Sequence, residues 1–331
     1  MKRDSSFFEE LLAMDDLEFF KNVRVSKEAF DFMLDMIEDD PPHRLHGKDK
    51  VTQCESLLIT LWFLGNKTTF RETAVQFRLS ISAVHRIFYN TVHHICQHAD
   101  KIIKWPSDLE VTEREFFEIA GFKGVVGAID GTHIEVRPPL EQNKAYQDRF
   151  MDHSEVLLAV CDAGMQFTYI STGFPGSIHD QRCLDLSHKL SAAITSPPNE
   201  YFPKHEYHIV GDTGFKLETT LMIPYKDYGN MSHDQIVYNT KLSRTRVIIE
   251  NAFSSLKGRF RCLEYLEVDI DKVTPIIVAC CVVHNIAFMF PDSFFSVPEI
   301  PTEAVQSEEY RGSDPNPDAT QKREYICRNL L

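Results

Sequence analysis

The stretch "VVGAIDGTHIEVRPP" at residues 125–139 decides how the rest of the chain is interpreted. Its first residues are small and apolar, as in a buried strand, and they lead directly to Asp130, Gly131, Thr132 and His133. An unpaired carboxylate at the tip of a buried strand costs several kcal/mol, roughly, so a partner of opposite charge is expected nearby. The chain must therefore provide a counter-charge for Asp130.

A second aspartate has the same local setting. The segment "HIVGD" at residues 208–212 is another apolar run with a glycine just before the acid, Asp212. A carboxylate at the tip of a buried strand tends to lie where the sheet opens to solvent. The repeated pattern predicts two strand ends that face one site.

The third acid, Glu250, lies in "LSRTRVIIENAFSSLKGRF" at residues 242–260. Helical spacing places it on a polar stripe beside a buried apolar stripe, so it lies at the border between core and solvent. A pair with Arg246, four residues earlier, is the alternative and contributes a few tenths of a kcal/mol, roughly. Taken singly, each of the three acids is better interpreted as a structural residue than as a catalytic one.

Taken together, Asp130, Asp212 and Glu250 favour a metal site. Two aspartates and a glutamate without a matching set of His or Cys ligands are typical of a hard cation, Mg²⁺ or Mn²⁺. Two such ions activate a water or hydroxyl and stabilise the leaving oxygen of a phosphodiester. The basic residues that would hold the phosphate backbone beside them are Lys257, Arg259 and Arg261.

The first third of the chain has helical patterns. Thr69 and Glu72 form a capping-box pattern that predicts a helix over about 70–78, and Ser80 or Ser82 can begin a second helix that runs to about His98. Two helices with a tight turn between them are typical of a helix-turn-helix, although an ordinary helical hairpin explains the pattern equally well. The residues of this segment expected to contact DNA are Arg78, Ser82, His85 and Arg86.

The formal net charge of −14 argues against a simple nucleic-acid binder. The charge is unevenly distributed, however, because residues 51–105 carry a net charge of +3 and residues 241–261 a net charge of +5. The acidity is concentrated at the two ends of the chain. The two basic interior segments coincide with the predicted DNA-contacting and phosphate-holding residues.

Composition also bears on cysteine chemistry and membranes. The eight cysteines form no CxxC pair, and no secretory signal is evident, which favours reduced thiols in an intracellular protein. Neither Cys281 with His284 nor Cys96 with its neighbouring histidines completes a zinc ligand set. The apolar run at residues 276–290 is too short for a membrane span and predicts a buried helix.

Short apolar runs with a hairpin signal at "CDAGM" (161–165), followed by helical segments, predict an α/β fold, an α+β mixed sheet flanked by helices. Four parts are expected. They are an N-terminal helical segment and linker at 1–50, a helix-turn-helix-like region at 51–121, a catalytic domain at 122–290 and an acidic, mobile tail at 291–331.

Five motifs in this order resemble the PIF/Harbinger transposase family: "GAIDGTHIEV", "PGSIHDQRCLDLS", "GDTGF", "LSRTRVIIENAFSSLKGRFRCL" and "IIVACCVVHNIA". The resemblance covers residues 50–290. It implies an RNase-H-like domain whose DDE triad binds two divalent ions, preceded by a helix-turn-helix. The triad falls on Asp130, Asp212 and Glu250. Three further residues match family motifs: His133, His179 and Asp180. They either support the metal ligands or orient loops, and loop orientation is favoured.

The resemblance implies a metal-dependent DNA endonuclease or transposase of the DDE type that cleaves transposon ends with Mg²⁺ or Mn²⁺. It also implies a Myb-like partner protein, and localisation to the nucleus, or to the cytoplasm until that partner is present. The alternative is a domesticated, catalytically inactive DNA-binding or scaffold protein. Homo-oligomers are compatible with the sequence, and a membrane is not expected. The recognised DNA sequence does not follow from the residues.

Overall fold

The computed structural model describes residues 6–37, 51–139, 141, 143–291, 294–295 and 316–330. The chain divides into two compact units. The helical unit comprises residues 1–103, 134–137 and 255–298, and the sheet unit comprises residues 104–133, 138–254 and 299–331. Because each unit draws on separated parts of the chain, this division does not follow the predicted boundaries at 50, 121 and 290, which stay predictions.

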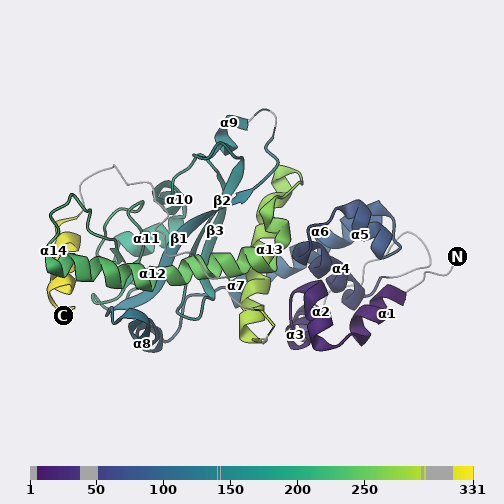
Figure 1. The fold of residues 1–331 in the computed structure, drawn as a ribbon, viewed down its shortest axis with the longest axis horizontal. Helices are drawn as coiled ribbons and strands as arrows, with labels where there is room; N and C mark the ends of the chain where they lie inside the picture. The colour runs from purple at the N-terminus through teal and green to yellow at the C-terminus, as the bar shows by residue number, and fades with distance from the viewer. Residues whose placement is uncertain are drawn as a thin grey trace. The chain divides into compact units, whose positions relative to one another are not determined.

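The sheet has five strands in the order β3-β2-β1-β4-β5. Figure 1 labels β1, β2 and β3 of this sheet. The antiparallel pair is β2 with β3, whereas β4 runs parallel to both β1 and β5. The prediction of a mixed sheet is therefore confirmed. The strands are β1 (Val125–Glu135), β2 (Ser154–Cys161), β3 (Phe167–Pro175), β4 (His208–Val210) and β5 (Leu221–Met222).

The predicted hairpin at "CDAGM" connects β2 to β3. The Asp162 carboxylate accepts hydrogen bonds from the backbone N–H groups of Gly164 and Gln166, which fixes the turn. All eight residues of β2 are buried, as expected for a strand covered on both faces.

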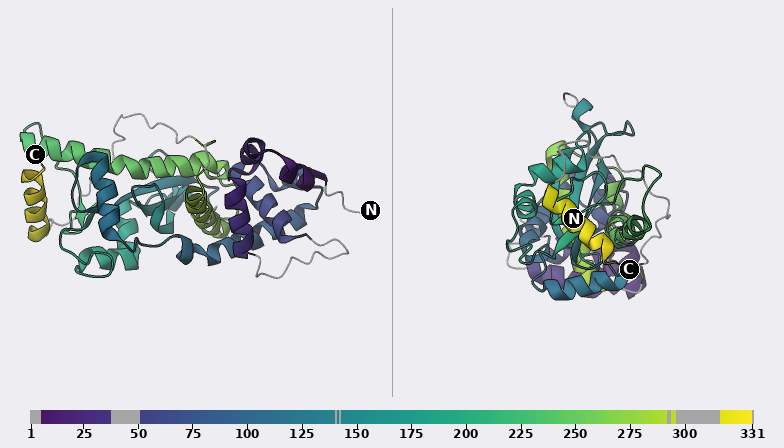
Figure 2. Two further views of the ribbon diagram at one scale, coloured as in Figure 1. Left: turned by 90° about the horizontal axis from the view of Figure 1, so that it is seen from below. Right: turned by 90° about the vertical axis from the view of Figure 1, so that its left-hand side faces the viewer.

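Helices cover both faces of the sheet. One face packs on α10 (Asp180–Leu186) and α11 (His188–Thr195), whose Leu184, Leu190 and Ile194 join the core with strand residues. Helix α12 (His233–Arg259) lies across the other face, where Phe253 contacts Phe167 of β3 (Figure 2). The remaining helices of the sheet unit are α8 (Leu109–Ala120), α9 (Asn143–Tyr146) and α14 (Pro317–Arg328).

Helix α14 differs from the expected mobile tail. The Lys322 ammonium donates to the carbonyl oxygens of His205, Tyr207 and Thr219, and Ala319 is buried. These contacts tie residues 316–330 to the sheet unit, because a cation can satisfy several strand-end and loop carbonyls at once. The acidic stretch at 296–315 lies outside the described residues.

The helical unit contains both helices predicted around residue 80. The capping box of Thr69 with Glu72 is present, and the Ser80 hydroxyl accepts the N–H of Ala83 at the start of the second helix. The described helices of this unit are α1 (Ser6–Ala13), α2 (Asp16–Val23), α3 (Lys27–Ile37), α4 (Gln53–Gly65), α5 (Phe70–Gln76), α6 (Ile81–Gln97), α7 (Ala99–Ile102), the 3-10 helix η2 (Arg261–Glu264) and α13 (Ile270–Met289).

Helix α13 is the core of the helical unit and confirms the buried helix predicted at 276–290. It packs against α3, α6 and α7. By length and composition it is the one helix among the described residues that could cross a membrane, but 67% of its most apolar window is buried inside the protein. Cys281 and His284 lie fully buried in this helix, and all eight cysteines of the chain are free.

Candidate metal centre

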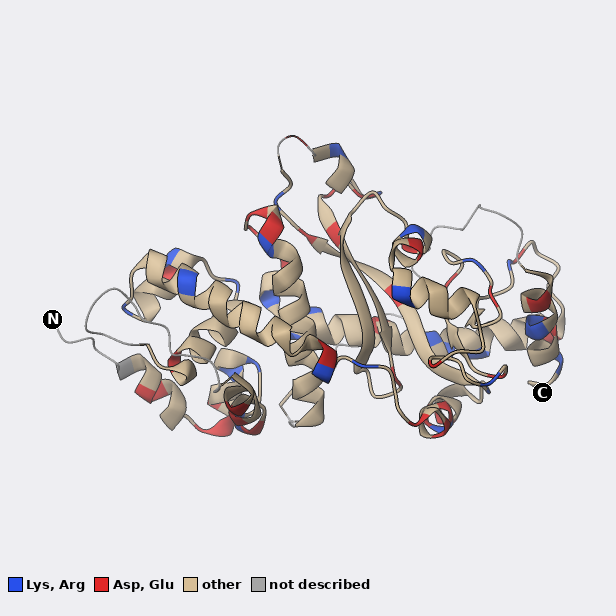
Figure 3. Cartoon of the chain, turned by 180° about the vertical axis from the view of Figure 1, so that it is seen from behind, with Lys and Arg blue, Asp and Glu red and all other residues tan. Residues whose placement is uncertain are grey.

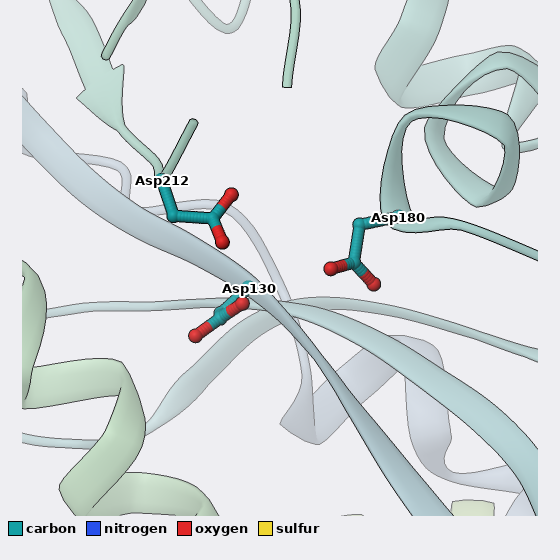
Figure 4. Close-up of side chains that lie close together, drawn as sticks. All are labelled: Asp130, Asp180 and Asp212. Atoms are coloured by element: carbon teal, nitrogen blue, oxygen red, sulfur yellow. The ribbon is translucent and has the colours of Figure 1, made fainter. Parts of the chain in front are cut away.

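Three aspartates from different elements meet in the sheet unit (Figure 4). Asp130 lies in β1, Asp180 is the first residue of α10, and Asp212 follows the end of β4. Each offers one carboxylate oxygen, and these oxygens all lie within 4.8 Å of one another. We call these three residues the acidic cluster. It is the one group of this kind found among the described residues.

The strand register explains why Asp130 and Asp212 are neighbours. Ala128 of β1 pairs with Val210 of β4, and each aspartate lies two residues beyond its paired position. Sequence analysis placed Asp130 at a strand tip, which is wrong because β1 continues to Glu135. The neighbouring strand β4 ends at Val210, and its end leaves the middle of β1 accessible at Asp130.

Asp180 joins the cluster by a close approach over Gly131. A Cβ atom built on Gly131 would lie 1.9 Å from the Asp180 Oδ1 atom, so no other residue fits there without displacing the carboxylate. The sequence favoured a loop-orienting role for Asp180 over support of the metal ligands. The signal for a larger role was an acid at the start of a helix, directly after the turn "GSIH" at residues 176–179.

Burial and like charges both oppose the ionised form of Asp130. Burial and the neighbouring carboxylates of Asp212 and Asp180 raise the pKa of Asp130 well above its usual range, against the opposing effects of Arg246 and the Gly131 N–H. A cation placed among the three aspartates would relieve this repulsion.

Arg246 provides the counter-charge that the sequence demanded for Asp130. Its Nη1 atom lies 3.0 Å from Asp130 Oδ2, and its Nη2 atom pairs with Glu250 Oε1 one helical turn later on α12. Although burial lowers the pKa of Arg246, the carboxylates of Asp130 and Glu250 raise it on balance. Glu250 is thus linked to the cluster through Arg246, and it is not one of the three acids whose oxygens converge.

The donor set fits a hard divalent cation. Three carboxylate oxygens within 4.8 Å can share one ion or flank two, and oxygen ligands suit Mg²⁺ or Mn²⁺. Asp212 is buried, whereas Asp130 and Asp180 are partly exposed, so the cluster is reachable from solvent.

His133, for which the sequence favoured a loop-orienting role, belongs to a hydrogen-bonded network with Ser154 and Asp148. Its Nδ1 atom lies 2.8 Å from Ser154 Oγ, and that hydroxyl donates to the Asp148 carboxylate. The Asp148 carboxylate also accepts the N–H groups of Phe150 and Asp152. His133 therefore orients the loop between β1 and β2. His179 occupies the N-cap position of α10, next to Asp180.

The predicted phosphate-holding residues differ in position. Arg261 is exposed. Burial lowers the pKa of Lys257 to about 8, although Glu135 acts to raise it. Arg259 is only 3% exposed, and its guanidinium donates to the Arg24 carbonyl. This position speaks against a phosphate contact by Arg259, because its donor is already engaged in the core.

The raised pKa of Asp130 predicts how pH affects the stability of the metal-free protein. Protonated Asp130 contributes to the free energy of unfolding. This contribution is fully present below the ordinary aspartate pKa of about 3.9 and is lost as the pH rises through the raised pKa of Asp130 in the folded protein. Asp130→Asn, which cannot ionise, should unfold at a temperature higher by roughly a few degrees at pH 8 in EDTA. Thermal unfolding at pH 4 to 8 checks this, and a gap that does not shrink toward pH 4 would contradict it.

Comparison with known proteins gives two family matches. Residues 129–285, which include the acidic cluster and Glu250, match the family described as DDE superfamily endonuclease. Residues 2–97 match a domain of unknown function. No solved structure matches the chain.

Individual relatives are similar over most of the chain. HARBI1 of Bos taurus, named as a candidate nuclease, is 31% identical over 240 residues, which cover 70% of this chain and 66% of the relative. HARBI1 of Homo sapiens is 30% identical over the same length. Protein ALP1-like of Arabidopsis thaliana is 28% identical over 294 residues, covering 84% of this chain and 72% of the relative. The match thus spans just under two thirds of the HARBI1 proteins.

Proposed function

The chain carries a DDE superfamily endonuclease domain and is homologous to the Harbinger transposase-derived nuclease HARBI1 and to ALP1-like proteins, and from this premise we propose that it is a metal-dependent DNA endonuclease. The observation that carries the proposal is the acidic cluster inside the matched domain. Cleavage of a phosphodiester at transposon ends is the proposed reaction.

The residues divide the work as follows. Asp130 and Asp212 would hold the divalent ions, Asp180 would add a third carboxylate from α10, and Glu250 would complete the set from α12. Mg²⁺ or Mn²⁺ bound there would supply the chemistry that activates a water and stabilises the leaving oxygen. The buried strands β1 and β4 keep the two central carboxylates at a fixed separation, which positions the ions relative to the phosphate.

An RNase-H-like architecture is part of the proposal. Support comes from the strand order β3-β2-β1-β4-β5, with an antiparallel pair on one side and parallel strands on the other.

We propose that α5 and α6 form a helix-turn-helix and that this motif binds DNA. The four predicted contact residues, Arg78, Ser82, His85 and Arg86, are all exposed. Figure 3 shows basic positions on these helices, at the upper left, and acidic positions on the helices near the N-terminus. In a helix-turn-helix, the second helix is the recognition helix and enters the major groove, and a short turn joins it to the first helix.

Replacing Arg86 by alanine tests this docking surface. If the guanidinium contacts a phosphate, the variant should bind duplex DNA more weakly across sequences, and the slope of log K against log salt should fall by about 1. Fluorescence anisotropy over a salt series measures both. Arg114→Ala on α8, also exposed, removes the same charge elsewhere, and an equal loss in both variants would sink the assignment.

The nuclease activity is tested with a DNA duplex that carries transposon terminal repeats. Purified protein with Mg²⁺ or Mn²⁺ should nick or cut this duplex, and EDTA should stop the reaction. A Myb-like partner and a nuclear location belong to the same proposal, so the assay is run with and without such a partner. Failure to cut under all these conditions would favour the alternative below.

The alternative is a domesticated DNA-binding or scaffold protein that no longer cuts. The net charge of −14 supports it, and so does a relative from Arabidopsis thaliana, 25% identical, whose name describes an antagonist of a heterochromatin protein. Metal binding separates the two readings, because an inactive scaffold has no need to keep the affinity of the acidic cluster for Mn²⁺.

A further inference from the structure

Arg246 engages two carboxylates of the proposed site at once. Its guanidinium contacts Asp130 Oδ2 with one nitrogen and Glu250 Oε1 with another. The other oxygen of Asp130 accepts the N–H of Gly131. Both Asp130 oxygens are therefore already hydrogen-bonded, one to a backbone N–H and the other to the Arg246 side chain.

A guanidinium and a divalent ion compete for the same carboxylate. Bound to one carboxylate, the guanidinium and the divalent ion would lie only a few ångströms apart. The repulsion between these two positive charges is large enough to weaken metal binding about tenfold or more, even with an effective dielectric constant of about 20. The Arg246 side chain is 16% exposed, so it is anchored between the acids but reaches the surface. Its neighbour Arg244 on α12 is exposed.

We propose that Arg246 is a built-in counter-ion that holds Asp130 and Glu250 together before metal arrives and transfers to a DNA phosphate when metal binds. The inference rests on the proposed function, because it concerns the same carboxylates. A planar guanidinium suits this exchange, since its paired N–H groups match carboxylate and phosphate oxygens equally well. Metal binding and DNA binding then strengthen each other, as linkage requires.

A purely structural role makes the opposite prediction. If Arg246 only positioned Glu250 for the metal, removing it would leave Glu250 disordered and would weaken metal binding. If it competes with the metal, removing it frees two carboxylates and strengthens metal binding. The sign of the change in Mn²⁺ affinity therefore separates the two roles without any measurement of cleavage.

The first experiment titrates Mn²⁺ into the full chain and follows free Mn²⁺ by electron paramagnetic resonance. Arg246→Gln should bind Mn²⁺ about tenfold more tightly than the wild type. Arg246→Lys keeps the charge and should stay close to the wild type. Arg244→Gln, which removes the same charge from an exposed position of α12, is the matched control and should change the affinity little.

The second experiment measures DNA affinity by fluorescence anisotropy with and without Ca²⁺, a cation that supports binding to oxygen ligands. The wild type should gain affinity for a labelled duplex when Ca²⁺ is added. In Arg246→Gln this gain should fall by about threefold or more, because the freed guanidinium is missing. In Arg244→Gln the gain should be unchanged.

An equal or weaker Mn²⁺ affinity in folded Arg246→Gln, or an undiminished Ca²⁺-dependent gain, would overturn the counter-ion role. If Arg246→Gln fails to fold, Arg246→Lys decides through the second experiment, since a lysine lacks the paired donors and should lose part of the gain. A wild-type protein that binds no Mn²⁺ would instead contradict the proposed function itself.

Discussion

Replacing Asp130 by asparagine is expected to reduce metal-dependent DNA cleavage by about three orders of magnitude or more. Asp130 lies at the centre of the site, because Asp180, Asp212 and Arg246 all lie next to it. An asparagine keeps the size and one oxygen but loses the charge that attracts the ions. Losing several kcal/mol of transition-state stabilisation corresponds to a rate loss of this order.

The same variant should still fold and bind DNA. The burial of Asp130 opposes its ionised form, so the neutral side chain does not destabilise the metal-free fold. Cleavage of the terminal-repeat duplex, the Mn²⁺ titration and duplex anisotropy are measured on one preparation. Mg²⁺-dependent nicking retained at the wild-type rate would refute the assignment of Asp130, whereas parallel loss of DNA binding would point to a folding defect.

Sequence reasoning found Asp130 and Asp212 because their pairing depends on local pattern. Each comes directly after a short apolar run, and parallel strands in register bring equivalent positions together. The position of Asp180 depends instead on how the turn before α10 folds back over Gly131, and an acid at a helix start does not by itself specify that approach. Single carboxylates can be predicted from local pattern, but the long-range approach that completes the cluster cannot.

Glu250 shows a second limit of sequence reasoning. Helical spacing correctly placed it at the border of the core, and it offered either a metal ligand or a pair with Arg246. Helical periodicity fixes which residues share a face, but it does not fix the partner of a long side chain that can reach several acids. The bridge from Arg246 to Asp130 spans 116 residues of sequence and depends on how α12 packs on the sheet.

The mixed sheet, the capping box of α5 and the buried α13 were all predictable from periodicity and cap chemistry. The division into units was not, because residues 255–291 pack with the N-terminal helices although they follow the sheet in sequence. Nor was the docking of α14. That helix is held by half-buried Lys322, whose three carbonyl partners lie about a hundred residues earlier in the chain.

Asp180→Asn should reduce cleavage by about a hundredfold and weaken Mn²⁺ binding by about tenfold, a smaller effect than that of Asp130→Asn because Asp130 and Asp212, the two carboxylates proposed to hold the ions, both remain. Gly131→Ala tests the same carboxylate by geometry. Its added Cβ would displace the Asp180 side chain without removing the charge, so both variants should lose metal affinity together. Cleavage rates and Mn²⁺ titrations provide the comparison.

Asp185→Asn is the matched control for Asp180→Asn, since it removes a carboxylate from an exposed position of the same helix and should leave metal binding unchanged. Glu250→Gln measured alongside decides which acid completes the pair formed by Asp130 and Asp212. Loss of cleavage in Glu250→Gln with wild-type behaviour in Asp180→Asn would restrict the site to the three acids that the sequence singled out. Loss in both would show that four carboxylates from β1, β4, α10 and α12 share the ions, with Asp180 entering only because residue 131 has no side chain.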